Sequence, residues 1–529
     1  MKELNLSELT VKQKIGMTLC GYIFFNQDEA KVEENLQYAI ELIKDHSLGA
    51  VWVRPNVANR EEVIARIKAA ADYPILIFTD AESGFVDNLI GRHNAISMTG
   101  SEELAYIFGK VTGTKARKAG YNVVCNPILD LNLGNSVCNM TMRSYGADKE
   151  TVTRLAAAEA RGMHDAGVLT VGKHYPGGTT DLEMDSHMAE AISGETEEEL
   201  VQRNIYPYVQ LSKMGLLDGM MTAHCRFPNI DPDYPASLSE KVIGIVRDQG
   251  FDGFAITDAL AMMGIVAKFG SKDSKGLSIQ NGNDLALCWV DNKTAFEAMV
   301  ECYEKGILTE DRLDIAAARV LQAQHKTTLF RACQELTEEE LALYDKINTD
   351  GIYATADDGL HYAIDPKGKH FIALQVPVGS ADSHGNITVD TFTNQWYQPK
   401  IIRNMLEEKF PNSRVFAMDE FPSTSHNWIL LNENIDYDDV VLITFIDGKA
   451  YQGDENFTGR FLTAVKALQR TNRVSAIVHY GNPFPLESLE HIPRVIVGST
   501  SEKAVETGIR VLAGEYPAKG VLAYDIHLK

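Results

Sequence analysis

The chain has 529 residues, and its 73 acidic and 50 basic residues give a formal net charge of −23 at pH 7. A charge of this sign opposes binding to a polyanion, so the composition excludes a nucleic-acid-binding protein. The 45% of hydrophobic residues is typical of a globular protein with a substantial core. No apolar run approaches the ~20 residues that a membrane-spanning helix needs, so no membrane partner is expected.

The seven cysteines are scattered along the chain and form no Cys-x-x-Cys pair. Most of them lie in apolar stretches, which favours buried free thiols over a disulfide framework. The N-terminus has no apolar core of a signal peptide. Together these features predict a protein of the reducing cytoplasm.

The first two-thirds of the chain alternates short apolar runs with longer amphipathic stretches. The runs that predict strands are Gly16–Phe25, Ala50–Arg54, Pro74–Asp80, Asn122–Asp130, Thr170–His174, Gly219–His224, Gly253–Asp258 and Asp284–Trp289. The patterns that predict helices are Asp28–Asp45, Arg60–Ala71, Glu103–Ala119, Lys149–Ala166, Thr196–Met214 and Glu240–Gln249. Strands separated by helices are typical of parallel βα units. We therefore expect a (β/α)8 TIM-type barrel over residues 1–335.

A second α/β pattern follows, over residues 370–529. Residues 336–369 are helical and then polar, which predicts a helical tail and an interdomain linker. Predicted strands are Phe371–Val376, Arg414–Met418, Val440–Phe445, Ala476–His479, Arg494–Gly498 and Val521–Tyr524, and predicted helices are Gln395–Lys409, Thr458–Gln469 and Glu502–Leu512. This pattern favours an α/β/α three-layer sandwich around a mostly parallel sheet. No phosphate-binding glycine motif follows a strand, so no nucleotide cofactor is expected.

Ionisable side chains stand at the C-terminal limits of several predicted barrel strands. In a (β/α)8 barrel the active site is built at this rim, from residues that follow different strands. Asp130 also suits the N-cap of the next helix, because aspartate caps helices well. The rim residues are Asp80, Asp130, Lys173, His174, His224 and Asp258.

The segment after the fifth predicted strand has the highest density of chemically active residues. Lys173 and His174 stand side by side where this strand ends, and a Pro-Gly-Gly turn at residues 176–178 begins a loop. The loop ends in Asp185-Ser186-His187. This pattern indicates a functional loop more than a polar surface loop with incidental histidines.

Asp258 is the candidate nucleophile. A carboxylate at a barrel strand end can attack an anomeric carbon and form a glycosyl-enzyme ester, which is the retaining glycosidase route. His187, with an ordinary pKa near ~6.5, can act as both acid and base at neutral pH. Asp185 can orient its imidazole and stabilise the charged form. The expected substrate-binding residues are Asp80, Arg143, Lys173, His174 and His224.

Two other classes use the same residues. A metal-dependent barrel hydrolase needs three or more converging ligands, for which His174, His187, His224, Asp185 and Asp258 are candidates. The His-x-His usual on the first strand of such enzymes is missing, so we expect no metal. A sugar-binding protein without catalysis is also conceivable, but the presence of the candidate nucleophile and acid/base argues against it.

The motifs resemble those of family 3 glycoside hydrolases, in particular the β-N-acetylglucosaminidase branch of bacterial peptidoglycan recycling. They occur in family order over nearly the whole chain. The matching segments are Asp80-Ala81-Glu82-Ser83-Gly84, Asn126-Pro127-Ile128-Leu129-Asp130, Arg143-Ser144-Tyr145-Gly146, Lys173-His174-Tyr175-Pro176-Gly177 with Asp185-Ser186-His187, Met221-Thr222-Ala223-His224, Thr257-Asp258-Ala259-Leu260, Gly282-Asn283-Asp284 and Gly481-Asn482-Pro483.

The resemblance implies a retaining β-N-acetylhexosaminidase of carbohydrate metabolism that acts on N-acetylglucosaminides through a covalent glycosyl-Asp intermediate. It implies Asp258 as nucleophile, the Asp185–His187 dyad as acid/base on a mobile loop, and no cofactor or metal. It also implies that sugar is bound by Asp80, Arg143, Lys173 and His174. We expect a carbohydrate as the substrate and a monomer or homodimer.

The chain departs from the family pattern in its sugar-recognition segment. Ser83 replaces a glycine, and no arginine follows until Arg92, although arginines usually follow this motif in the family. These changes affect recognition of the sugar more than the catalytic pair, so a β-glucosidase of the same family is one alternative. A β-N-acetylglucosaminide phosphorylase is another, because an imidazole acid/base repels an anionic acceptor less than a carboxylate does.

Overall fold

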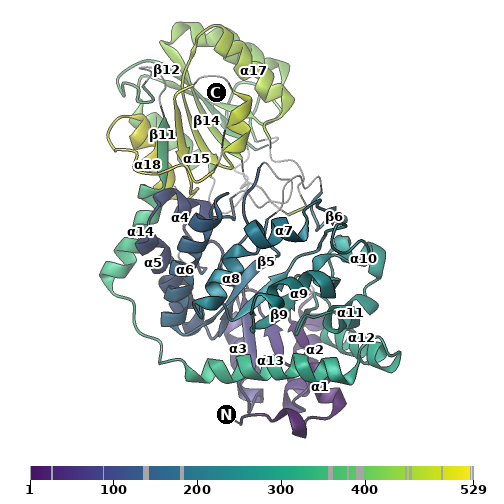
Figure 1. Ribbon diagram of the computed structural model, residues 1–529. Coiled ribbons are helices and arrows are strands. Elements are labelled where there is room, and N and C mark those ends of the chain that lie inside the picture. The colour runs from purple at the N-terminus through teal and green to yellow at the C-terminus, as the bar shows by residue number, and fades with distance from the viewer. Residues whose placement is uncertain are drawn as a thin grey trace. The chain divides into compact units, whose positions relative to one another are not determined.

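The computed structural model describes residues 2–24, 28–86, 89–134, 142–178, 184–355, 361–377, 380–388, 398–446, 450–451, 456–489, 492–524 and 526. The ends of two predicted elements, Phe25 and Gln395, lie outside these ranges. By contact density the chain forms two compact units (Figure 1). The first unit comprises residues 1–88, 105–140 and 144–344, and the second comprises residues 89–104, 141–143 and 345–529.

An eight-stranded parallel sheet forms the centre of the first unit. Its strands are β1 (Leu19–Tyr22), β2 (Ala50–Trp52), β3 (Leu76–Thr79), β4 (Val123–Val124), β5 (Leu169–Tyr175), β7 (Gly219–Thr222), β9 (Phe254–Thr257) and β10 (Ala286–Leu287). They pair in the order β10-β1-β2-β3-β4-β5-β7-β9. The Thr257 N–H donates to the Leu285 carbonyl at 3.1 Å, which joins β9 to the segment leading into β10. The sheet closes on itself, so the predicted (β/α)8 barrel is confirmed.

Helices surround this barrel. They are α1 (Val11–Met17), α2 (Glu29–Lys44), α3 (Arg60–Ala70), α5 (Glu102–Lys118), α6 (Lys149–Ala166), α8 (Tyr206–Lys213), α9 (Glu240–Asp248), α10 (Met263–Phe269), α11 (Asp273–Gln280), α12 (Asn292–Glu304) and α13 (Glu310–Leu329). The predicted helix Thr196–Met214 is instead divided into α7 (Glu197–Glu199), a π-helical segment (Leu200–Asn204) and α8. Pro207 has no N–H to donate to the preceding turn, which accounts for the interruption.

Along each barrel strand, alternate residues point into the barrel, because side chains in a strand alternate between the two faces. One buried cluster contains the inward residues, including Cys20 and Tyr22 of β1, Phe78 of β3 and Ile256 of β9. The residues between them pack outward against the helices in a second cluster. The next inward position after Phe78 is residue 80, and the next after Ile256 is residue 258. The strand period therefore directs these two carboxylates towards the mouth of the barrel.

The opposite end of the last strand is closed by a buried ion cluster. Asp284, which precedes β10, is fully buried and accepts from Arg247, Arg312 and Arg319 at 3.0, 3.0 and 3.3 Å. Arg247 belongs to α9, and the other two arginines belong to α13. Asp284 therefore ties the last strand to the helices at the N-terminal end of the barrel.

The second unit contains a six-stranded sheet. Its strands, in the order in which they pair, are β11 (Ile352–Thr355), β16 (Arg494–Val497), β15 (Val474–Gly481), β14 (Asp439–Ile446), β12 (His370–Val376) and β13 (Arg414–Asp419). All pairs are parallel except β11 with β16. One hydrophobic cluster packs α15 (Pro399–Lys409) and α18 (Glu502–Leu512) against the sheet, and another packs α16 (Thr424–Asn432) and α17 (Gly459–Arg470). These layers confirm the predicted three-layer sandwich (Figure 1).

One predicted strand of this unit is wrong. The segment Val521–Tyr524 forms no strand, because its neighbourhood is bonded to two separate partners: Gly520 donates to Ile352 and Val521 donates to Met98. The antiparallel edge strand is β11, which lies in the segment interpreted as a linker. The boundary between the two units falls within α14 (Glu338–Asp350), and α4 (His93–Thr99) belongs to the second unit. No helix in the described ranges is both long enough and apolar enough to span a membrane.

Candidate active site

Asp258 directly follows β9, and its surroundings favour the ionised form. Its backbone N–H donates to the Thr222 carbonyl at 3.0 Å, and its Oδ1 accepts the Ala259 N–H at 2.7 Å. Burial raises the pKa of Asp258, but His174 and the Ala259 N–H lower it, and the pKa lies below its ordinary value. The candidate nucleophile is therefore a carboxylate at neutral pH.

Lys173 links two carboxylates of another strand end. Its Nζ lies 2.5 Å from Asp80 Oδ1 and 2.7 Å from Glu82 Oε1, although the lysine side chain itself is buried. A buried ammonium needs such partners. Asp80 is the most exposed of the three, with 44% of its side chain accessible, so it can still receive a ligand hydroxyl. Glu82 was not predicted as a site residue, although it lies within the motif that begins at Asp80.

His174 is oriented by Asp130. One carboxylate oxygen, Oδ2 of Asp130, accepts from both the backbone N–H and Nδ1 of His174, each at 2.8 Å. Asp130 thus fixes both the backbone and the ring of His174. The possible helix-capping role of Asp130 is therefore replaced by a role in fixing the histidine ring.

Asp185 and His187, the predicted acid/base dyad, are hydrogen-bonded to each other, and their catalytic role stays a prediction. Asp185 is buried, and its Oδ1 lies 2.7 Å from His187 Nδ1 and accepts the His187 backbone N–H at 2.9 Å. The dyad segment is anchored to the start of α10, because Gly264 donates to the Ser186 carbonyl at 3.0 Å and Met263 donates to the His187 carbonyl at 3.3 Å. Helix α10 begins five residues after the candidate nucleophile. His187 also contributes to the lowered pKa of that nucleophile, so the two groups share one electrostatic environment.

His224 is engaged on both ring nitrogens. Its Nε2 lies 3.0 Å from the Ala259 carbonyl and its Nδ1 lies 2.7 Å from Ser237 Oγ. A carbonyl can only accept, so Nε2 carries the proton and Nδ1 accepts from the serine hydroxyl. Burial lowers the pKa of His224, which keeps the ring neutral. Both ring nitrogens of His224 are thus engaged within the protein, and its contact with substrate stays a prediction.

Arg143 belongs to the second unit and is half-buried, and its contact with substrate stays a prediction. Within the described ranges, no group of three or more His, Cys, Asp or Glu side chains is arranged to hold a metal ion.

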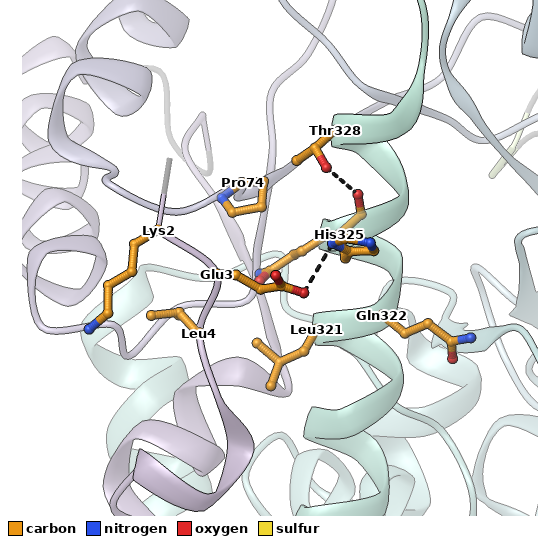
Figure 2. Close-up of a pocket in the computed structure, with 9 residues that line it drawn as sticks. Lys2, Glu3, Leu4, Pro74, Leu321, Gln322, His325 and Thr328 are labelled. Atoms are coloured by element: carbon orange, nitrogen blue, oxygen red, sulfur yellow. Dashed lines mark hydrogen bonds and ion pairs between the residues drawn. The ribbon is translucent and has the colours of Figure 1, made fainter.

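A separate cavity of about 530 Å³ lies near the other end of the barrel strands (Figure 2). Its lining includes Pro74, which precedes β3, and the last turns of α13. Figure 2 shows the ion pair between His325 and Glu3, 3.1 Å apart, at its wall. Asp80 stands at the opposite limit of β3, so this cavity is distinct from the candidate site.

The C-terminal rim of the closed (β/α)8 barrel carries a carboxylate, a lysine–carboxylate cluster and an Asp–His pair, and this rim is where barrel enzymes build their active sites. Residues 11–323 match the model of the glycosyl hydrolase family 3 N-terminal domain. The chain belongs to this family and is a glycoside hydrolase.

Curated relatives share a quarter to a third of their aligned residues with this chain. A beta-hexosaminidase A of Pseudoalteromonas piscicida is 25% identical over 425 residues, which cover 70% of this chain and 71% of the relative. A beta-hexosaminidase of Neisseria meningitidis serogroup C is 32% identical over 247 residues, which cover 44% of this chain and 67% of the relative.

Solved structures show the same fold over the whole chain. A family 3 β-N-acetylglucosaminidase from Paenibacillus sp. FPU-7 superposes with a TM-score of 0.79 at 23% identity and covers 98% of this chain and 100% of its own. A beta-glucoside phosphorylase, BglX, superposes with a TM-score of 0.81 at 23% identity over 99% of this chain and 95% of its own.

Proposed function

We propose that this protein is a retaining β-glycosidase, and specifically a β-N-acetylhexosaminidase that cleaves N-acetylglucosaminides. The observation that carries the proposal is the pairing of an ionised Asp258 with the Asp185–His187 dyad, whose segment is hydrogen-bonded to the start of α10. The names of the curated relatives support the hexosaminide substrate. A cytoplasmic location and a monomeric or homodimeric state stay predictions.

In the first step, a carboxylate oxygen of Asp258 attacks the anomeric carbon. The bond from that carbon to the leaving oxygen breaks, and His187 transfers the proton on its Nε2 to the leaving oxygen. Asp185, on Nδ1, stabilises the imidazolium before the transfer. The result is a glycosyl ester on Asp258 and a neutral His187.

In the second step, His187 acts as the base. Its neutral Nε2 takes a proton from water while the water oxygen attacks the anomeric carbon and the ester bond to Asp258 breaks. Asp80, Lys173 and His174 hold the sugar hydroxyls during both steps. Two displacements at one carbon return the original configuration, which makes the enzyme retaining.

Phosphorolysis is the second candidate. The acid/base is an imidazole, so after the first step it carries no negative charge, and the buried Asp185 beside it is hydrogen-bonded to Nδ1 and the backbone of His187. An anionic acceptor therefore meets less repulsion than it would from a free carboxylate. A fold shared with a β-glucoside phosphorylase is compatible with this reaction.

The test uses p-nitrophenyl N-acetyl-β-D-glucosaminide and the purified full chain. We expect turnover that Asp258→Asn abolishes and that His187→Ala reduces by about 100-fold or more, because general acid–base catalysis contributes at least that much. With a dinitrophenyl leaving group, which needs little protonation, His187→Ala should show a burst and accumulate a glycosyl adduct on Asp258, detectable by intact-protein mass.

The matched control is His325→Ala, in the separate cavity of Figure 2, which should turn over as the wild type does. Turnover that persists in Asp258→Asn would overturn the mechanism, and turnover that a chelator abolishes would favour the metal-dependent hydrolase. Repeating the assay in phosphate and detecting N-acetylglucosamine 1-phosphate would assign the acceptor.

A further inference from the structure

Three side chains that the mechanism does not use stand together at the barrel mouth: Tyr22, Arg54 and Trp289. The rings of Tyr22 and Trp289 stack with centroids 5.4 Å apart at 22°. The Arg54 guanidinium lies 5.6 Å from each ring centroid. The three groups thus form a nearly equilateral triangle, in which the cation is held by both aromatic rings.

The strand period places this cluster on the inner side of the barrel. Tyr22 ends β1, and it packs in the inward-facing cluster with Trp289 against it. Arg54 lies two residues after Trp52, and Trp289 two residues after Leu287, and both of these reference residues point inward. Arg54 is exposed and Trp289 is half-exposed, whereas Tyr22 is buried behind them, so Arg54 and Trp289 are the members that reach solvent at the mouth.

The order of the strands locates the cluster between two residues of the candidate site. Around the mouth, β10, β1 and β2 lie between β9, which leads into Asp258, and β3, which leads into Asp80. Leu287 of β10 accepts the Leu260 N–H at 3.0 Å, which ties this sector to the segment after the nucleophile. At the other side, the charge of Asp80 acts on Tyr22: burial and Asp80 raise the pKa of Tyr22, while Arg54 lowers it.

The mouth therefore has two chemically different halves. One half, on β5, presents Lys173, which donates hydrogen bonds, and His174, whose imidazole can donate or accept them. The other presents two aromatic rings and a guanidinium that makes no ion pair with any acid in the described part of the chain. A pyranose has the matching asymmetry, because its hydroxyls point from its edge while its C–H groups form apolar patches that pack on aromatic rings.

We infer that Tyr22, Trp289 and Arg54 form the apolar wall of the site for the sugar held over Asp258, with Trp289 packing on its C–H surface and Arg54 donating to an oxygen at the edge near Asp80. The inference rests on the proposed function. Trp289 and Arg54 act by binding: they contact the sugar both before and during the reaction, so their loss raises KM more than it lowers kcat.

The experiment measures binding of N-acetylglucosamine by calorimetry and turnover of the p-nitrophenyl substrate in the same full-length variants. Trp289→Ala and Arg54→Ala should each weaken sugar binding and raise KM by about tenfold. Trp289→Phe, which keeps an aromatic ring, should retain most of the affinity. Trp428→Ala and Arg470→Ala are matched controls, since both residues are exposed in the second unit.

The outcomes separate the inference from the function on which it rests. A wild type that neither turns over nor binds the sugar overturns the proposed function. If the wild type does both, and Trp289→Ala and Arg54→Ala bind and turn over the sugar as the wild type does, the inferred wall is wrong and the proposed function is unaffected. Arg54 is exposed, so Arg54→Ala decides the matter if Trp289→Ala does not fold.

Discussion

At the scale of single residues, the candidate site contains side chains that are fixed by hydrogen bonds within the protein. Asp130 fixes the ring of His174, and Asp185 fixes the ring of His187. His224 is the clearest example, because both of its ring nitrogens form hydrogen bonds within the protein. One of these bonds is to the carbonyl of Ala259, the residue that follows Asp258. A shift of about 1 Å in a reacting group can cost 100-fold in rate, so such contacts bear directly on catalysis.

His224→Phe tests this positioning role. Phenylalanine keeps the volume of the ring but loses both hydrogen bonds, so the Ala259 carbonyl is left without its donor and Asp258 is less firmly placed. We expect kcat to fall by about 100-fold while KM changes little. His224→Gln, which can still donate to the carbonyl, should recover part of kcat, and the exposed His361→Phe should have no effect. A rise in KM with kcat preserved would instead support a substrate contact.

The sequence suggests the ionisable residues at the strand ends because charged side chains seldom follow a buried strand without a reason. It does not reveal their partners, since Ser237 and Asp130 become neighbours of His224 and His174 only in the folded barrel. It also misses Trp289, because an aromatic residue at the end of an apolar run looks like core. The inward alternation after Leu287 is the signal that could have indicated it. The roles of the site residues stay predictions.

At the scale of elements, the first turn of α10 is the part that places the acid/base. Its two leading N–H groups, from Met263 and Gly264, hold the carbonyls of His187 and Ser186. A Cβ on Gly264 would lie 2.8 Å from the Ser186 oxygen and 3.0 Å from the Ala189 oxygen. Only a residue without a side chain allows this close approach.

Gly264→Ala should therefore displace the dyad segment. We expect turnover of the p-nitrophenyl substrate to fall by about tenfold or more, since proton transfer is impaired. Formation of the glycosyl adduct from a dinitrophenyl substrate should be much less affected, because that leaving group needs no acid. Gly244→Ala in α9 is the control, as a Cβ there meets nothing within 4 Å. Equal loss with both substrates would show that the substitution disturbs the nucleophile as well.

Elements are predicted well where the hydrophobic period of a segment and its length indicate the same type of element. The eight barrel strands are examples, as is α6, whose bounds match the prediction. The failures have local causes. Pro207 interrupts the long helix after Thr196, and β11 is missed because its strand is short and lies in a polar context. Such a strand is defined by its pairing with β16 and has little signal of its own.

At the scale of the whole molecule, each unit has its own hydrophobic core and its own buried ionisable groups. In the second unit, His479 is a fully buried residue of β15 and pairs with Thr444 of the neighbouring strand β14. Its Nδ1 lies 2.8 Å from Thr444 Oγ1, and its Nε2 donates to the Asn482 carbonyl at 2.5 Å. Burial lowers the pKa of His479 to about 4.

This burial predicts a specific acid sensitivity. The unfolded chain binds a proton near the ordinary pKa of 6.5, whereas the folded protein resists protonation until about pH 4. The contribution of the neutral His479 to the free energy of unfolding is therefore fully present above pH 6.5. It is lost as the pH drops towards 4, by a total of about 3 kcal/mol. Urea unfolding at pH 7.5 and pH 4.5 measures the loss, and His479→Asn should show a smaller difference between the two. An equal difference in both proteins would mean that other groups control the acid response.

The closure of the barrel has a consequence for how the chain is made. Cys20 of β1 pairs with Leu287 of β10. Strand β1 therefore cannot pair on this side until nearly all of the barrel sequence has been synthesised. Until then β1 and β9 present bare edges, which are templates for aggregation. A fragment that ends before residue 286 is therefore expected to aggregate during synthesis. Truncation of this enzyme from the C-terminal side of the barrel would give inclusion bodies and not a smaller active enzyme.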